Sequence, residues 1–313
     1  HQRGIKLIMD LVSNHSSDEH MWFEESKKSK DNPYRDYYFW RPGKGQGGKR
    51  PPNNWKSNFL GSAWKYDSTT DEYYLHLFAE KQPDLNWDNP KVRQEIADIC
   101  NYWFDMGVDG FRCDVITYIS KTQGLPDGFP LDPRTGQEQY ILGPNWKKYI
   151  EEMNDKSWGN HDSMIVGEAV GITYKNAGEY ISENIKGLDT CFSFEHTMCD
   201  IPQMLADSPY PVKSFKKVMA NWQSLSSDCQ PTLYIENHDQ PRSVPRMTGD
   251  PGDKRREASK MLCIAMMMQR GTPYIYEGQE IGMTNCCYDD SEYKDVLTEN
   301  TFALAKKLLP LPV

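Results

Sequence analysis

The sequence has no excess of basic residues, no long apolar run and no C-x-x-C pair of cysteines. Its formal net charge of -9 argues against a nucleic-acid partner, because phosphate groups require a basic surface. No apolar stretch approaches the roughly 20 residues of a membrane-spanning helix, so we expect no membrane partner. The chain does not open with a basic segment followed by an apolar one, and therefore we predict no signal peptide.

The cysteines and aromatic residues predict a folded protein in a reducing compartment. The 8 cysteines show no metal-binding spacing, and several lie in apolar runs, so we expect reduced, buried thiols and a cytoplasmic location. Cys113 alternates with two charged neighbours on a predicted strand, which assigns its side chain to packing. Hydrophobic residues make up 38% of the chain and aromatic residues 12%, a composition that argues against disorder and allows one large domain.

Five apolar runs each end on a carboxylate. A buried strand that ends in a charge is unfavourable unless that end opens onto solvent or onto a site. The repetition of this pattern, with helix-like stretches between the runs, predicts a parallel barrel whose C-terminal rim holds the chemistry. The runs are residues 5–10, 108–114, 163–168, 232–239 and 272–277.

Six strand-like runs alternate with helical patterns along the chain. The predicted strands are residues 5–12, 108–115, 163–169, 188–194, 232–237 and 272–277, and the predicted helices are 91–105, 145–154, 175–184, 212–225, 253–269 and 299–309. Six strands do not close an eight-stranded barrel, so the sheet is either open and doubly wound or part of a fragment. The opening on His1 instead of Met, directly in a strand, favours the fragment.

Residues 16–83 differ in character from the rest of the chain. Proline and glycine are frequent between residues 33 and 52 and exclude a long helix there, while residues 73–78 (YYLHLF) alternate like a short strand. A disordered loop of this length would be unusual in a compact domain, and the aromatic content argues against it. We interpret the segment as a small excursion domain that leaves one strand–helix loop and lies over the rim.

Three carboxylates have the surroundings that sugar hydrolysis requires. Asp114 follows Arg112 by two positions, so both side chains share one strand face, and the guanidinium is expected to keep Asp114 ionised as a nucleophile. Glu168 ends an apolar run, where partial burial favours the protonated form of a general acid. Asp239 follows His238 in ENHD. Two carboxylates in unequal surroundings are typical of glycoside hydrolysis, although structural ion pairs explain the pattern equally well.

Five short motifs resemble, in order, the signature segments of the α-amylase superfamily. They are residues 10–15 (DLVSNH), 82–86 (QPDLN), 110–115 (GFRCDV), 166–169 (VGEA) and 236–239 (ENHD). The form of QPDLN, together with residues 119–128 (ISKTQGLPDG), 237–242 (NHDQPR) and 271–285 (GTPYIYEGQEIGMTN), is most similar to the oligo-1,6-glucosidase branch. In that branch a valine follows the nucleophile in enzymes that prefer α-1,6 bonds, and Val115 matches it.

The resemblance implies a (β/α)8 TIM barrel that is incomplete here, with about its third to eighth strands present. Residues 1–15 would hold the third strand, residues 16–83 the excursion domain B, and residues 84–313 the remaining barrel. N-terminal strands and a C-terminal β-domain would be missing. The resemblance implies no cofactor and no metal ligand in this chain, because the calcium site of some members would lie upstream.

The resemblance also implies a role for each matched residue. Asp114 would be the nucleophile, Glu168 the general acid and base, and Asp239 a carboxylate that holds ring hydroxyls and helps to distort the sugar. Further substrate-binding positions would be His15, Phe59, Phe78, Gln82, Arg112, His238 and Arg242.

Several of these positions have a structural alternative. Arg242 is expected to support the loop of Asp239 more than to touch substrate. Phe59 and Phe78 are as compatible with core packing as with a pocket wall. Asp84 in QPDLN is expected to tie the excursion domain to the barrel rather than to act in the reaction.

The resulting prediction is a monomeric, retaining, exo-acting α-glucosidase that hydrolyses α-1,6 bonds of isomalto-oligosaccharides. A blind pocket under the excursion domain would favour removal of one terminal glucose. The alternatives within the family are trehalose-6-phosphate hydrolase, sucrose isomerase and an α-1,4-specific maltase. A non-catalytic barrel that serves as a binding module is the alternative of a different class, and the presence of all three carboxylates argues against it.

Overall fold

A computed structural model describes residues 1–201, 209–249 and 251–308. The chain forms two compact units: unit 1 is His1–Met164 with Tyr288–Val313, and unit 2 is Ile165–Cys287. The chain passes from unit 1 to unit 2 inside strand β6 (Met164–Glu168).

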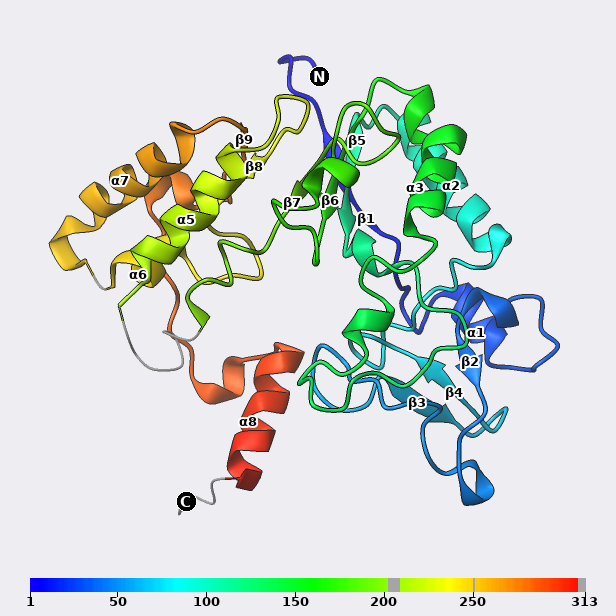
Figure 1. Ribbon diagram of the computed structural model, residues 1–313. Coiled ribbons are helices and arrows are strands. Elements are labelled where there is room, and N and C mark those ends of the chain that lie inside the picture. Colours follow the sequence, from blue (N-terminus) through cyan, green and yellow to red (C-terminus); the bar gives the residue numbers. More distant parts are fainter. Residues whose placement is uncertain (202–208, 250, 309–313) are drawn as a thin grey trace. The chain divides into compact units, whose positions relative to one another are not determined.

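Unit 1 is built on a parallel pair of strands, β1 (Ile8–Val12) and β5 (Gly110–Asp114). Along β5 the side chains alternate: Phe111 and Cys113 are buried, whereas the two charged residues between and after them are partly exposed. The buried face is covered by α2 (Pro90–Asp105), whose Phe104 ring lies 5.0 Å from that of Phe111 (Figure 1). Cys113 therefore packs into the core, as the alternation predicts.

Helix α2 begins where the sequence predicts and packs against a second helix. The side chain of Asn89 accepts a hydrogen bond from the amide of Lys91, and Pro90 occupies the first turn, where its missing N–H costs nothing. Helix α3 (Trp146–Lys156) lies beside α2, and Arg93 of α2 forms an ion pair of 2.6 Å with Glu152 of α3 (Figure 1). Short 3-10 helices η3 (Ile116–Tyr118), η4 (Gln137–Gln139) and η5 (Trp158–Asn160) complete this part.

The predicted excursion segment holds a small antiparallel sheet with an aromatic core. Strands β2 (Trp40–Arg41), β3 (Trp64–Asp67) and β4 (Glu72–Leu75) pair in the order β2-β4-β3. Helix α1 (Met21–Ser26) and the 3-10 helices η1 (Arg35–Tyr37) and η2 (Gln46–Gly48) accompany it. The ring of Phe23 on α1 stacks on Trp40 at 5.7 Å, and Trp40 meets Tyr74 edge-on at 5.5 Å. The predicted bounds of this domain, 16 and 83, remain a prediction.

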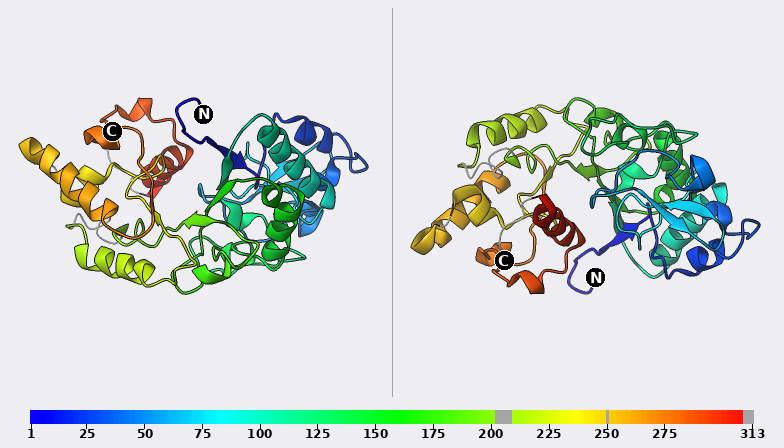
Figure 2. Two further views of the ribbon diagram at one scale, coloured as in Figure 1. Left: turned by 90° about the horizontal axis from the view of Figure 1, so that it is seen from above. Right: turned by 90° about the horizontal axis from the view of Figure 1, so that it is seen from below.

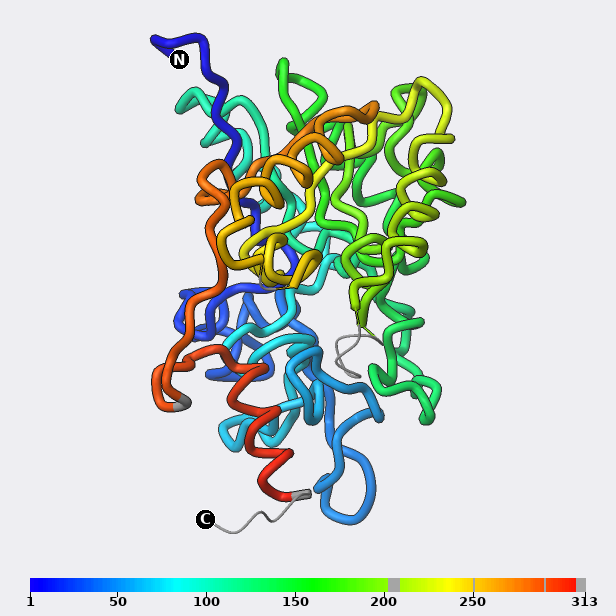
Figure 3. The backbone as a smooth tube through the Cα atoms, turned by 90° about the vertical axis from the view of Figure 1, so that its left-hand side faces the viewer, coloured from blue at the N-terminus to red at the C-terminus, as the bar shows by residue number. Residues whose placement is uncertain are grey.

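The C-terminal part of unit 1 lies beside this segment. It contains η9 (Asp290–Glu292) and helix α8 (Val296–Leu308). Asn300 Nδ2 donates a hydrogen bond of 2.7 Å to the carbonyl of Phe59, and Figure 3 shows α8 running alongside the segment.

Among its described residues, unit 2 contains two further parallel strand pairs and three α-helices. Strand β6 pairs with β7 (Thr190–Phe192), and β8 (Thr232–Leu233) pairs with β9 (Thr272–Pro273). Helices α5 (Val212–Gln223) and α7 (Arg255–Met267) contribute apolar side chains to a core that includes Leu233 of β8, and α6 (Ser243–Thr248) contributes Val244 to the same core (Figures 1 and 2). The 3-10 helices are η6 (Ala177–Glu179), η7 (Gly252–Lys254) and η8 (Gln279–Ile281).

Each of the six predicted strand runs contains a parallel strand, but the last two strands are only two residues long. Five predicted helices are confirmed within a few residues. The sixth, residues 175–184, is wrong, because only η6 forms there. Asn176 Oδ1 accepts a hydrogen bond from the Thr173 amide, and Ser182 Oγ donates to Asp228. These side-chain bonds compete with a continuous helix.

The described residues include all of the cysteines, and their helices can be compared with the requirements for crossing a membrane. All 8 cysteines are unpaired, and Cys100, Cys113, Cys191 and Cys229 are buried, as predicted. The prediction of buried thiols is wrong for Cys263, Cys286 and Cys287, which are exposed. None of the helices in the described ranges has the length and apolar character needed to cross a membrane.

Candidate active site

In unit 1 the end of β5 holds a carboxylate against a guanidinium. Arg112 Nη1 lies 2.5 Å from Asp114 Oδ1 and 2.7 Å from Asp10 Oδ1. The parallel register places Asp10 of β1 directly opposite Arg112, which explains the second contact. Asp114 is partly buried, with 21% of its side chain exposed, so its carboxylate is accessible but fixed in orientation by charge-assisted hydrogen bonding.

The residue after Asp114 has an unusual backbone conformation. Val115 has φ 35° and ψ 39°, in the left-handed region, and its side chain is buried. A β-branched residue in that region is strained by roughly 1–3 kcal/mol. The turn ends β5 and starts η3, so the position that the resemblance associates with bond preference is also the sharpest turn of this segment.

Four of the predicted substrate-binding residues lie together in unit 1. Gln82 Nε2 lies 3.0 Å from His15 Nε2, and the His15 and Phe78 ring centroids are 5.3 Å apart. Phe59 meets Phe78 edge-on at 5.7 Å. Phe78 also stacks on Tyr118 of η3, with centroids 5.8 Å apart. The cluster joins an imidazole and an amide to an aromatic wall, a combination suited to a sugar.

The imidazole of His15 has a pKa below its ordinary value. Burial lowers its pKa, while the nearby carboxylates of Asp84 and Asp114 raise it by smaller amounts. The amide nitrogen of Gln82 can only donate, so Nε2 of His15 accepts this bond. His15 Nδ1 lies 3.5 Å from Asn14 Nδ2, so an amide nitrogen faces each of the two ring nitrogens.

Asp84 joins the excursion segment to the end of β1. Its side chain is fully buried. Asp84 Oδ2 accepts a hydrogen bond of 3.0 Å from Asn14 Nδ2, and Oδ1 accepts one of 2.8 Å from the Leu77 amide. The connecting role expected of Asp84 is therefore present in its contacts.

In unit 2, Glu168 stands at the end of β6 and is buried, with 9% of its surface exposed. Tyr234 lies near it: burial raises the pKa of Tyr234, and the Glu168 carboxylate adds a smaller increase. Glu168 thus ends its strand largely removed from water.

His238 and Asp239 are exposed residues of a loop, and Arg242 follows them in the same loop. His238 Nε2 is 3.2 Å from Asp239 Oδ2, and the two side chains are 60% and 54% exposed. Arg242 Nη1 donates to Glu236 Oε1 at 3.0 Å and to the Glu277 carbonyl at 2.7 Å. Both contacts of the Arg242 guanidinium are with the protein itself, in keeping with the prediction that Arg242 supports the loop of Asp239.

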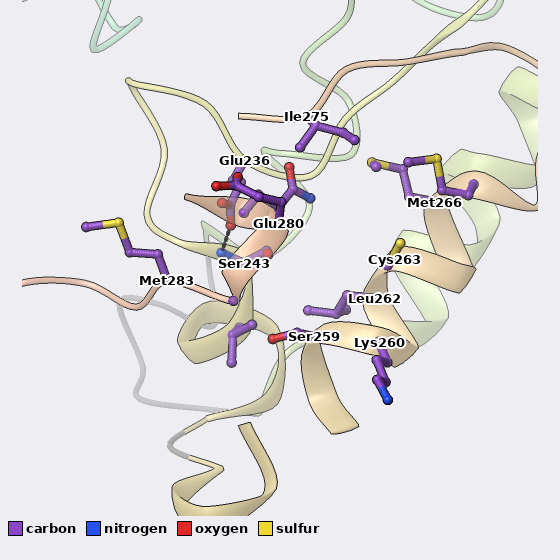
Figure 4. Close-up of a pocket in the computed structure, with 14 residues that line it drawn as sticks. Glu236, Ser243, Ser259, Lys260, Leu262, Cys263, Met266, Ile275, Glu280 and Met283 are labelled. Atoms are coloured by element: carbon purple, nitrogen blue, oxygen red, sulfur yellow. Dashed lines mark hydrogen bonds between the residues drawn. The ribbon is translucent and has the colours of Figure 1, made fainter. Parts of the chain in front are cut away.

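A cavity of about 280 Å³ lies in unit 2 between α7 and the segment that follows β9 (Figure 4). Its walls are mostly apolar and include Leu262, Met266 and Ile275. Glu236 reaches it but bonds to the Ser243 amide, as the dashed line in Figure 4 shows. Neither Glu168 nor Asp239 lines this cavity, so it does not coincide with the predicted carboxylates.

Two residues of unit 1 contact Phe78 or Asp84 but were given no role in the sequence analysis. Tyr118 stacks on Phe78, and Lys121 forms a fully buried ion pair with Asp84 at 2.8 Å. The available signal was a lysine directly after residues 115–120 (VITYIS), an uncharged stretch that follows Asp114. Among the described residues, no group of three or more His, Cys, Asp or Glu side chains is arranged to hold a metal ion.

The family profile for the catalytic domain of alpha amylase matches residues 1–307. The chain belongs to the α-amylase family. It is 51% identical over 309 residues to an oligo-1,6-glucosidase of Parageobacillus thermoglucosidasius, with 96% of this chain and 54% of that protein covered. The chain thus spans about half the length of the curated relatives it matches.

Two solved structures of α-amylase-family relatives resemble the chain over its whole length. A mutant trehalose-6-phosphate hydrolase of Bacillus licheniformis has a TM-score of 0.91 and 41% identity, and covers 100% of this chain and 56% of its own. A mutant isomaltulose synthase of Erwinia rhapontici NX5 in complex with sucrose has a TM-score of 0.92 and 35% identity, with the same two coverages. Family and neighbours assign the parallel strands to a (β/α)8 barrel rather than to an open, doubly wound sheet.

Proposed function

We propose that this α-amylase-family chain carries the catalytic centre of a retaining, exo-acting α-glucosidase that hydrolyses α-1,6 bonds of isomalto-oligosaccharides. The observation that carries the proposal is the arrangement at the end of β5. There Arg112 holds the Asp114 carboxylate at 2.5 Å, on the strand whose motif has an oligo-1,6-glucosidase form. The 51% identity to an oligo-1,6-glucosidase supports the substrate class.

Each of the three carboxylates has one step in the proposed reaction. Asp114 attacks the anomeric carbon while Glu168 protonates the leaving oxygen, which gives a covalent glucosyl ester. Glu168 then removes a proton from water, the water oxygen attacks the anomeric carbon, and α-glucose leaves as Asp114 is regenerated. Retention requires the two carboxyl groups to be roughly 5–5.5 Å apart during the reaction. Asp239 binds ring hydroxyls and stabilises the distorted sugar.

The residues grouped in unit 1 supply the glucose pocket in this proposal. His15 forms a hydrogen bond with a sugar hydroxyl, and Gln82, whose Nε2 lies 3.0 Å from His15 Nε2, fixes the orientation of the imidazole. Phe78, together with Phe59 and Tyr118, forms an apolar wall against which a pyranose ring packs. His238 adds a donor beside Asp239.

The proposed organisation follows the family. We propose that β1 is the third strand of the barrel, β9 is the eighth, and residues 16–83 form domain B. The absence of disulfides among the 8 cysteines, four of which are buried, supports a reducing location such as the cytoplasm.

The test is a turnover panel on the native polypeptide that carries this chain. Purified wild type and Asp114→Asn are assayed with isomaltose, maltose, trehalose-6-phosphate and sucrose. Release of glucose from isomaltose that is lost in the variant supports both the substrate class and the nucleophile. Turnover of trehalose-6-phosphate or sucrose alone would assign the chain to a sister activity. No turnover of any of the four by a folded protein would favour a binding module.

The bond preference is tested separately at Val115. Val115→Thr keeps a β-branched side chain of similar shape at the left-handed position and adds a hydroxyl. We expect the ratio of isomaltose to maltose turnover to fall at least severalfold, because this side chain adjoins the nucleophile. An unchanged ratio would remove Val115 as a determinant of bond preference.

A further inference from the structure

Lys121 is a charged residue with no solvent exposure of its side chain. It lies seven positions after Asp114, beyond the turn at Val115 and helix η3. A lone ammonium in such a place would be strongly unfavourable, so its partners must compensate for the lost hydration. Burial does lower the pKa of Lys121, and the carboxylate of Asp84 acts in the opposite direction.

The partners of Lys121 come from two other family motifs. Its Nζ donates a hydrogen bond of 2.8 Å to Asn14 Oδ1 and forms an ion pair of 2.8 Å with Asp84 Oδ2. Asn14 and Asp84 are also bonded to each other, at 3.0 Å. The ring of Phe39 lies beneath the ammonium, with its centroid 5.4 Å away. Three side chains from three separate segments thus form one closed triangle of bonds.

Each corner of this triangle lies within seven positions, along the chain, of a residue of the proposed site. Asn14 immediately precedes His15, Asp84 follows Gln82 by two positions, and Lys121 belongs to the segment that leaves Asp114. His15 and Asp84 also form a backbone bridge between their segments. The 3.0 Å bond between His15 and Gln82 therefore depends on how the triangle sets the separation of these two segments.

We propose that Lys121 is a positioning residue: through Asn14 and Asp84 it sets the places of His15 and Gln82 relative to the segment that carries Asp114. This inference rests on the proposed function, since it assigns these residues to a glucose pocket. Lys121 itself does not touch the sugar. Its contribution is to hold the donors of the pocket in a geometry that a pyranose can use without rearrangement.

A single Lys121 variant is a poor test, because it leaves the buried Asp84 carboxylate unpaired and can prevent folding. The double variant Lys121→Met/Asp84→Asn removes both charges and keeps the side-chain volumes close to native. The matched control is Arg35→Met/Glu72→Gln. It removes a well-buried ion pair of 2.5 Å from the same unit, where Arg35 contacts Ser26, Thr70 and Glu72 but no motif residue.

The experiment compares wild type and both double variants of the native polypeptide, using isomaltose as substrate and glucose as competitive inhibitor. Both variants are expected to unfold in one transition well above the assay temperature. In the Lys121/Asp84 variant we expect kcat/KM for isomaltose to fall, and the inhibition constant of glucose to rise, at least tenfold. In the control both values should stay within twofold of wild type. A purely structural role would lower the melting temperature without changing glucose affinity.

The outcomes separate this inference from the proposed function. Wild type that does not hydrolyse isomaltose overturns both. Active wild type together with a folded Lys121/Asp84 variant whose glucose inhibition constant is within twofold overturns the positioning role alone. Should that variant not fold, Lys121→Gln/Asp84→Asn is measured, because it also removes both charges of the pair and leaves no buried charge unpaired. A glucose inhibition constant raised less than threefold in this second variant would then overturn the role of Lys121.

Discussion

Replacing Gly110 with alanine is expected to destabilise unit 1 by about 2–4 kcal/mol. A Cβ at this position would lie 2.0 Å from the carbonyl oxygen of Met164, whereas ordinary van der Waals contact begins at 3.4 Å. The two backbones would have to separate by about 1.4 Å, the difference between these values. The 3.0 Å bond from the Met164 amide to the Asp109 carbonyl would then open. Overpacking costs about 1–3 kcal/mol and the lost hydrogen bond about 1 kcal/mol.

Urea unfolding followed by tryptophan fluorescence measures the effect, and Gly178→Ala is the control. A Cβ at Gly178 would meet nothing closer than the Cys229 sulfur at 3.9 Å, so its free energy of unfolding should stay within about 0.5 kcal/mol of wild type. Because Asp114 lies four residues beyond Gly110 on β5, Gly110→Ala should also lower kcat/KM. A Gly110→Ala protein as stable and active as wild type would refute the close approach of these backbones.

Two further predictions concern unit 2. Arg242→Met should lower the free energy of unfolding by about 3–5 kcal/mol, because the Glu236 side chain, 1% exposed, loses its cation. Adding Glu236→Gln should recover part of that loss, and equal stabilities of the single and double variants would contradict the pairing. Burial lowers the pKa of His196 from 6.5 to about 4, so the unfolded chain takes up the proton first. As pH falls from 6.5 toward 4, stability should therefore drop by up to about 1.4 kcal/mol per pH unit. His196→Gln should flatten this part of the stability curve, measured by urea unfolding at each pH, and an unchanged slope would count against the prediction.

The features that sequence predicted well depend on short-range geometry. Alternation along a strand placed Arg112 and Asp114 on one face, and the two form an ion pair. The cap residue Asn89 and the following proline marked the start of α2 correctly. The Pro- and Gly-rich segment excluded a long helix, and the part of the chain that the structure describes has only short elements there. In each case the deciding interaction lies within a few residues of the pattern.

The features that sequence did not predict depend on partners distant in the chain. The expected helix at 175–184 is interrupted in part by Ser182, whose hydroxyl bonds to Asp228, 46 positions away. The ion pair of Lys121 with Asp84 joins positions 37 residues apart, and no local periodicity connects them. The left-handed turn at Val115 was also missed, because a β-branched residue is among the least suited to it.

At the left-handed turn of Val115, stability and bond preference favour different side chains. Asparagine and glycine adopt left-handed backbone angles with less strain than valine. In a library randomised at position 115, selection for thermal stability alone should therefore enrich asparagine and glycine. Selection for growth on an α-1,6-linked sugar should instead enrich side chains that shape the pocket. Comparing the stabilities of the two enriched sets would measure how much stability the chain loses through the residue that determines its bond preference.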